Sequence, residues 1–119
     1  MNCSKKIASA ALLASAPYLA WAHATIVTSE PAKNATLTAS PPAIVLAFNE
    51  PVEPAFSSIK LINEHGKAVA TEKAVVDPAR KKVLRSVLPV LTNGKYTVKY
   101  RTMGRDGHKR AGEYQFTVK

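Results

Sequence analysis

Two stretches near the end of the chain, residues 96–101 and 114–119, alternate apolar and polar side chains with a period of two. In a β-strand this period places the apolar side chains on one face and the polar ones on the other. The apolar set predicted to face a core comprises Tyr96, Val98, Tyr100, Tyr114, Phe116 and Val118. Two successive strands of this kind commit the chain to a β-sheet with one buried face.

The rest of the chain predicts more strands and no amphipathic helix. Five further stretches are predicted as short strands, namely residues 25–28, 43–48, 57–63, 68–76 and 83–88. Residues 31–42 are predicted as a loop, and residues 64–67 as a hairpin turn. The total of seven strands in a chain of this length favours an all-β Greek-key sandwich or small barrel. Tyr96, which follows the turn at residues 92–94, resembles the tyrosine corner of immunoglobulin-like sandwiches.

The first residues indicate export. Two lysines precede an apolar run over residues 7–19, and Ala20-Trp21-Ala22 closes it with a small-x-small cleavage pattern. The run is shorter than the roughly 20 residues that span a bilayer. We therefore predict a secretory signal peptide over residues 1–22 and one β-domain over residues 23–119, exported to the periplasm. An uncleaved N-terminal anchor is the alternative.

The composition excludes several classes of site and partner. Cys3 is the one cysteine and lies within the predicted leader, so the exported domain has neither a disulfide nor a thiolate ligand. The chain has 17 Lys and Arg against 8 Asp and Glu, a formal net charge of +9. Such a charge can indicate nucleic-acid binding. Scattered basic residues and predicted export argue against it, and we expect a monomer with no nucleic-acid partner.

Cleavage after Ala22 would make His23 the first residue. Its free amine and its imidazole Nδ1 could then close a chelate ring around one metal ion. The amine and imidazole have ordinary pKa values of about 7.7–8.0 and about 6.5, so a metal displaces their protons at modest cost near neutral pH. Two nitrogens are too few for a tight protein site, and further ligands must come from the fold.

Asp106-Gly107-His108 can supply them from the loop between the last two predicted strands. In extended chain, residues i and i+2 point to the same side, so a carboxylate and an imidazole can enter one coordination plane. Three nitrogens and one oxygen in such a plane, without a soft ligand, favour Cu(II). His65 lies in the predicted turn at residues 64–67 and is expected to be solvated.

These motifs together resemble the CopC-type family of periplasmic copper-resistance proteins, also known as the PcoC or YobA type. The segments that carry the resemblance are His23, Ser29-Glu30-Pro31-Ala32, Leu46-Ala47-Phe48-Asn49-Glu50, residues 91–101, Asp106-Gly107-His108, Gly112 and Phe116-Thr117-Val118. The resemblance covers the whole predicted domain. It implies a cupredoxin-like or immunoglobulin-like Greek-key barrel that binds Cu(II) through His23, Asp106 and His108. It also makes Glu50 a candidate outer ligand.

The resemblance implies a role in copper resistance or homeostasis, or in delivery to a membrane copper transporter of the CopD type, without catalysis. Some members of the family also hold Cu(I) in a methionine-rich loop. Met103 is the one methionine of the predicted domain, and a single thioether cannot form such a site. Met103 is expected to be a packing residue, and a Cu(II)-only carrier fits the chain better.

Two other functions remain open from the sequence. Copper-dependent polysaccharide monooxygenases also bind their metal with an N-terminal histidine, so an oxidative copper enzyme is the main alternative. An aspartate in the ligand set, and a chain too short to add a flat aromatic surface, argue against that enzyme. A metal-free adhesion or scaffold sandwich is the third hypothesis, because the fold alone does not determine function.

Overall fold

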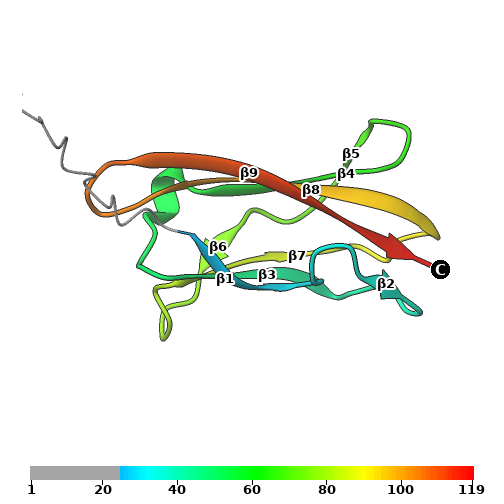
Figure 1. Cartoon of the computed structure of the whole chain (residues 1–119), viewed down its shortest axis with the longest axis horizontal. Helices are drawn as coiled ribbons and strands as arrows, with labels where there is room; N and C mark the ends of the chain where they lie inside the picture. The colour runs from blue at the N-terminus through cyan, green and yellow to red at the C-terminus, as the bar shows by residue number, and fades with distance from the viewer. Residues whose placement is uncertain (1–24) are drawn as a thin grey trace, which may run out of the picture.

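In the computed structural model, residues 25–119 fold into two β-sheets that pack face to face (Figure 1). The predicted leader over residues 1–22 and the predicted ligand His23 lie outside these described residues. The prediction of an all-β sandwich is confirmed. Within the described part of the chain, no helix has the length and hydropathy needed to cross a membrane.

The two sheets contain four and five strands. The four-stranded sheet, in spatial order, consists of β1 (Ile26–Glu30), β3 (Ala43–Phe48), β7 (Val83–Val87) and β6 (Val75–Val76). The five-stranded sheet consists of β2 (Thr36–Leu37), β9 (Lys109–Val118), β8 (Gly94–Met103), β4 (Ser58–Ile62) and β5 (Ala68–Val69). One 3₁₀ turn, η1 (Pro54–Phe56), lies between β3 and β4, where the chain crosses from one sheet to the other.

The strand order is that of an immunoglobulin-type Greek key. β3 pairs with β7 in one sheet, and β4 pairs with β8 in the other, so the chain crosses between the sheets from β3 to β4 and again from β7 to β8. The order β1-β3-β7-β6 against β9-β8-β4 corresponds to the two sheets of that sandwich. The core therefore holds the chain together through contacts between residues far apart in the sequence.

Inward-facing side chains of both sheets form one core. Its fully buried large side chains include Ile44, Leu46, Leu61, Leu84, Val98 and Phe116. The rings of Tyr96 and Phe116 stack across the β8–β9 pair with centroids 5.5 Å apart. Full burial of one such side chain contributes about 1.5–3 kcal/mol, so a sandwich without a disulfide can be stable.

The structure has nine strands in residues 25–119, where the sequence predicted seven. The predicted loop over residues 31–42 contains β2, which pairs in parallel with the end of β9. The predicted strand over residues 68–76 is wrong as a single element: β5 pairs with β4, whereas β6 pairs with β7 in the opposite sheet. Between them the Glu72 amide donates to the carbonyl of Val87 (3.0 Å), so this segment bonds to β7 as it crosses.

The predicted tyrosine corner is confirmed. The Tyr96 hydroxyl donates a 2.6 Å hydrogen bond to the backbone carbonyl of Thr92, four residues upstream. The ring is buried, and its hydroxyl lies at the edge of the core. This bond ties the turn before β8 to the first inward-facing residue of that strand.

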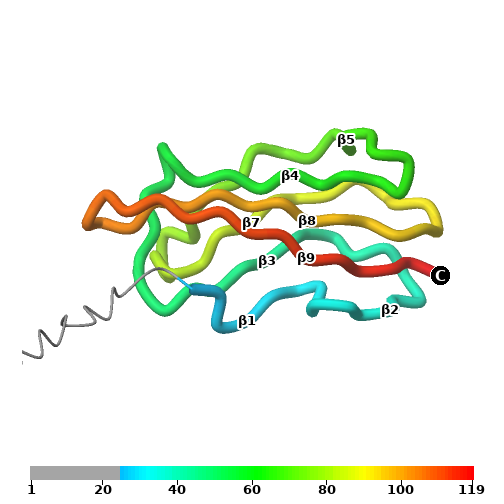
Figure 2. The backbone as a smooth tube through the Cα atoms, turned by 45° about the horizontal axis from the view of Figure 1, so that its top comes forward, coloured from blue at the N-terminus to red at the C-terminus, as the bar shows by residue number. Residues whose placement is uncertain are grey.

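The ends of the sandwich differ in what they carry. In Figure 2, the hairpin between β8 and β9 projects at one end of the molecule, and the C-terminus lies at the other. The first residues of β1 also lie at the hairpin end (Figures 1 and 2). The predicted metal ligands Asp106 and His108 follow β8 directly, so they belong to this end.

The tyrosine corner gives a test of the fold. Tyr96→Phe removes the hydrogen bond to Thr92 and keeps the ring, so it should lower the free energy of unfolding by about 1 kcal/mol. Tyr100→Phe is the matched control, because the structure gives the Tyr100 hydroxyl no hydrogen bond within residues 25–119. Urea denaturation followed by circular dichroism measures both. Equal losses in the two variants would contradict the role assigned to the corner.

Candidate metal centre

The tip of the β8–β9 hairpin holds Asp106 in a three-residue loop. The Gly104 amide donates to the carbonyl of His108 (3.1 Å), and the Gly107 amide donates to the carbonyl of Gly104 (3.0 Å). Gly107 has a φ of 82°, in the left-handed region that glycine adopts without steric cost. This pattern is that of a tight hairpin whose loop ends on a glycine. It explains why Asp-Gly-His occurs where two long strands must reverse direction.

Asp106 and His108 contact each other directly. Their closest atoms, Asp106 Oδ2 and His108 Nδ1, are 2.7 Å apart, and the His108 backbone amide donates to Asp106 Oδ1 (3.1 Å). The two side chains are 47% and 42% exposed, so a solute can reach them. The hydrogen bond from the His108 side chain, followed by that from its amide, holds the pKa of Asp106 below its ordinary value. The carboxylate is therefore ionised over the whole neutral range.

Glu50 approaches the same loop from β3. A Cβ atom on Gly104 would lie 2.8 Å from Glu50 Oε1 and 2.9 Å from Asp106 Oδ1. The two carboxylate oxygens thus converge over the Cα of Gly104, a position where any side chain would displace them. Sequence reasoning missed Gly104, because its importance comes from two side chains that meet there only in the folded protein.

Backbone contacts hold the segment after β3 against the hairpin. Val52 forms an isolated β-bridge with Gly104, and the Glu53 amide donates to the carbonyl of Met103 (2.8 Å). The hydroxyl of Ser57 donates to the carbonyl of Glu53 (2.7 Å) and closes the turn around η1. Glu50 is therefore carried by a segment that is bonded to the base of the loop.

The first described residue is anchored beside Glu50. The Thr25 amide donates to Asn49 Oδ1 (2.8 Å), and the Asn49 amide donates to the carbonyl of Thr25 (3.0 Å). This reciprocal pair fixes the entry of the chain into β1 next to residue 50. Sequence reasoning had given Asn49 no role beyond ending a strand.

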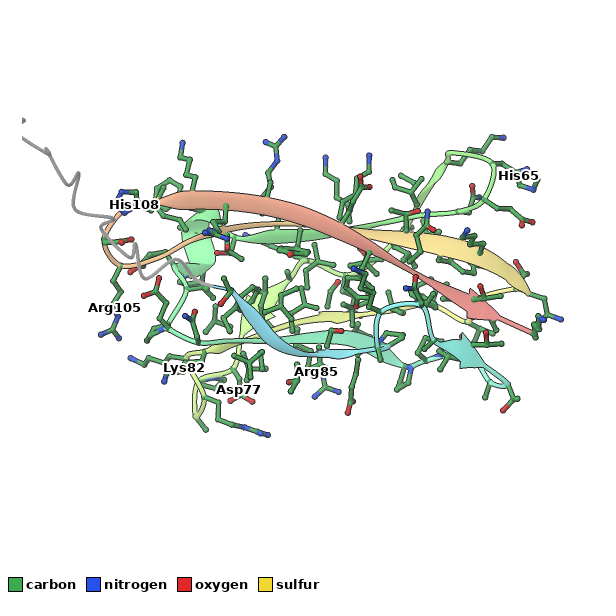
Figure 3. All side chains as sticks on the ribbon, viewed as in Figure 1. His65, Asp77, Lys82, Arg85, Arg105 and His108 are labelled. Carbon is green, nitrogen blue, oxygen red and sulfur yellow. The ribbon has the colours of Figure 1, made fainter. Side chains whose placement is uncertain are left out.

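The structure brings Asp106 into contact with His108 and brings Glu50 toward Asp106 over Gly104, and it separates His65 from them. Figure 3 shows His108 at the hairpin end and His65 at the opposite end, in the turn after β4. His65 is exposed there, as predicted for a solvated turn residue. Within residues 25–119, no three His, Cys, Asp or Glu side chains are grouped closely enough to hold a metal ion. A complete site at the hairpin end would need a donor from outside this range.

Comparison with known proteins points to one family. A family model described as the CopC domain matches residues 26–119. The protein YobA of Escherichia coli K12 is 39% identical over 102 residues, which are 83% of this chain and 81% of YobA. The copper transport protein CutJ of Bacillus subtilis is 32% identical over 103 residues, which are 86% of this chain but 19% of CutJ.

The fold agrees with these matches. The crystal structure of CopC from Methylosinus trichosporium OB3b superposes with a TM-score of 0.77 at 38% sequence identity. The superposition covers 81% of this chain and 93% of the CopC chain. The similarity therefore extends through both sheets and includes the segments that form the hairpin end.

The contact between Asp106 and His108 gives a test by titration. His108→Ala removes the side-chain hydrogen bond, so the pKa of Asp106 should rise toward its ordinary value of 3.8. Carboxyl NMR shifts followed over acidic pH measure this pKa in the wild type and the variant. His65→Ala should leave it unchanged, since His65 lies at the other end. An unaltered Asp106 pKa in His108→Ala would show that the contact does not exist in solution.

Proposed function

Because the chain belongs to the CopC family of copper resistance and copper transport-related proteins, we propose that it carries one Cu(II) ion at the hairpin end of the sandwich. The proposed ligands are the amine and imidazole of His23, the imidazole of His108 and the carboxylate of Asp106. The observation that carries the proposal is the direct contact of Asp106 with His108 at the end of the sandwich where β1 also begins (Figures 1 and 2).

The position of Thr25 supports the part assigned to His23. Each residue of an extended chain spans at most about 3.6 Å, and His23 is two residues before Thr25. Thr25 is itself bonded to Asn49, the neighbour of Glu50. A chain that runs from Thr25 toward the loop would bring His23 within reach of Asp106 and His108 and would complete a set of three nitrogens and one oxygen.

The chemistry of the donor set supports Cu(II). Amine, imidazole and carboxylate groups are hard or borderline ligands, and a planar arrangement of them suits Cu(II) better than Zn(II). Loading the site would release the protons of the amine and the imidazoles, so affinity should fall as the pH drops below about 6.5. If copper binds the imidazole of His108 at Nδ1, its coordinate bond would replace the hydrogen bond between that ring and Asp106.

Glu50 fits the role of an outer ligand or a charge partner. Its carboxylate and that of Asp106 meet over Gly104. Two carboxylates so placed repel each other, and a cation between or beside them offsets that repulsion. We propose that Glu50 raises the affinity of the site for copper through its charge rather than by completing the plane.

Export and delivery form the second part of the proposal. Residues 1–22 would act as a secretory signal, which leaves the domain in the periplasm with His23 at its start. CutJ carries the name of a copper transport protein and is about five times as long as its match with this chain. We propose that the chain, as a separate domain, delivers copper to a membrane transporter without catalysing a reaction.

The free amine of His23 provides the sharpest test. One extra residue before His23 turns this amine into an amide, which does not ligate readily at neutral pH. The Cu(II) affinity should fall by about 100-fold or more. Loss of a residue that only hydrogen-bonds to a ligand already costs about 10–100-fold in metal affinity, and loss of a ligand should cost at least as much. Titration against a competing chelator measures the affinity, and electron paramagnetic resonance counts the nitrogen ligands.

The control for this experiment is His65→Ala in the chain that begins at His23. This variant should bind Cu(II) as the parent does, because His65 lies at the opposite end of the sandwich (Figure 3). Circular dichroism should be the same for all three proteins. Equal Cu(II) affinity with and without the added residue would mean that the amine is not a ligand.

Gly104→Ala tests the convergence of the two carboxylates. The new Cβ would push the ends of the Glu50 and Asp106 side chains aside, and both ends can swing into solvent without unfolding the hairpin. We expect the Cu(II) affinity to fall by about 10-fold, with a smaller change in stability. Isothermal titration and thermal denaturation measure the two effects.

Asp106→Ala and His108→Ala provide the reference for a lost ligand and should weaken Cu(II) binding more than Gly104→Ala does. Unchanged affinity in Gly104→Ala would place the metal away from the position where the carboxylates meet.

A further inference from the structure

The outward side of β4, β8 and β9 carries a concentration of positive charge. Side chains alternate along these strands, and the exposed positions include Lys60, Lys95, Lys99, Arg101 and Lys109, which together are called the basic face below. Within these three strands, Glu113 is the one acidic residue. Nitrogen-tipped side chains project from this side of the five-stranded sheet in Figure 3.

The register of the sheet brings like charges together. Lys60 lies directly opposite Lys99 across the β4–β8 pair, and Arg101 is the next outward residue along β8. On its other side, Lys99 lies opposite Glu113 of β9, so three cations surround one carboxylate. Like charges directly opposite each other destabilise a sheet. In the part of the chain that the structure describes, the ion pairs within 4.0 Å all involve a histidine, so no carboxylate neutralises these cations at contact distance. The repulsion favours a partner that brings negative charge.

The outward side of the other sheet is different. Its exposed charges within β1, β3 and β7 are Glu30 and Arg85, which balance, and Val45 lies between them in register. The strands of the two sheets therefore differ in outward charge, and cations predominate on the outward side of β4, β8 and β9. A charge distribution of this kind orients a protein on an anionic surface.

The basic face is long and shallow. β8 and β9 have 10 residues each, which corresponds to a length of about 33 Å. A hollow of about 680 Å³ lies over it, bordered by the three cations Lys60, Lys99 and Arg101 and by one carboxylate, Glu113. Its floor includes Ala111 and Gly112, where the absence of long side chains leaves room between the cations.

We propose that the basic face docks the protein on an anionic phospholipid membrane, with lipid phosphates held in the hollow between Lys60, Lys99 and Arg101. Cations spread along an extended flat sheet match an array of headgroups better than they match a single acidic peptide. Lysine and arginine side chains reach such a surface from a rigid sheet without a change of fold. The proposal rests on the charge of this face and does not depend on the metal site.

Docking in this way would leave the proposed copper site at the edge of the contact. Lys109 is the first residue of β9, directly after His108. With the long axis of β8 and β9 parallel to the membrane, the hairpin tip would lie close to the headgroups. A copper carrier held in that orientation would present its metal to a partner embedded in the same membrane.

Binding to vesicles tests the proposal with the protein purified after export. It should sediment with vesicles of mixed phosphatidylglycerol and phosphatidylcholine, and not with phosphatidylcholine alone. The interaction should weaken as salt shortens the Debye length, which is about 10 Å at 0.1 M. The triple variant Lys60→Gln/Lys99→Gln/Arg101→Gln should lose about 100-fold in partitioning, since each basic residue near an anionic surface contributes about fivefold.

The matched control is Arg80→Gln/Lys81→Gln/Lys82→Gln, which removes the same charge from the exposed loop before β7. It should lose only a few-fold in partitioning, and both variants should keep the stability and the Cu(II) affinity of the wild type. Equal losses in the two variants would show an effect of net charge alone and overturn the proposal. Equal binding to phosphatidylcholine vesicles would also overturn the proposal. Failure to bind phosphatidylglycerol vesicles would overturn it too, and retention on an acidic polypeptide would then identify a protein partner instead.

Discussion

The pairing of β8 with β9 is the interaction on which the rest of the molecule depends. Ten residues of one strand face ten of the other without a break in register, from Gly94 opposite Val118 to Met103 opposite Lys109. Because side chains alternate, this one hairpin sends Tyr96, Val98 and Phe116 into the core and sends its cations to the opposite side. Its closing turn then carries Asp106 and His108. The core, the basic face and the proposed metal site therefore all depend on the register of the β8–β9 pair.

A close contact between the ring of Tyr100 and the backbone of Gly112 lets the hairpin fit the core. Tyr100 lies opposite Gly112, and its phenol ring covers the Cα of that glycine so closely that a Cβ there would collide with it. The same ring meets Phe48 edge-on, with centroids 6.2 Å apart. Gly112 is thus required by the packing of β8 against β3, although no turn occurs there. The motif that includes Gly112 in the family resemblance has a structural cause.

The sequence predicted the sandwich and its inward-facing residues well, because period-two alternation is a local signal. It failed where the fold depends on partners. β2 has two residues and is a strand only because it pairs with β9, which begins more than 70 residues later. Residues 68–76 are apolar at both ends, with Thr71, Glu72 and Lys73 between them, and the chain changes sheets within this segment, which periodicity did not signal. The candidate ligands Asp106 and His108 were predicted from spacing, whereas Gly104 and Asn49 could be identified only from contacts across the fold.

Charge differs between the outward side of β4, β8 and β9, where cations predominate, and the hairpin end, where the carboxylates of Glu50 and Asp106 meet over Gly104. The chain carries a formal charge of +9, which by itself would repel a divalent cation from solution. Coulomb energy falls with distance, and salt screens exposed charges beyond about 10 Å. An ion at the hairpin tip would therefore respond to the nearest charges, which are the carboxylates of Glu50 and Asp106, where they meet over Gly104, and the cations Arg105 and Lys109 of the same hairpin. The lysines along β4 and β8 act on larger anionic surfaces instead, since many of them can face a plane at once. In the proposed arrangement, Lys60, Lys99 and Arg101 lie along the strands rather than at the hairpin tip, so one small domain would attract a cation at its end and an anionic surface along its side.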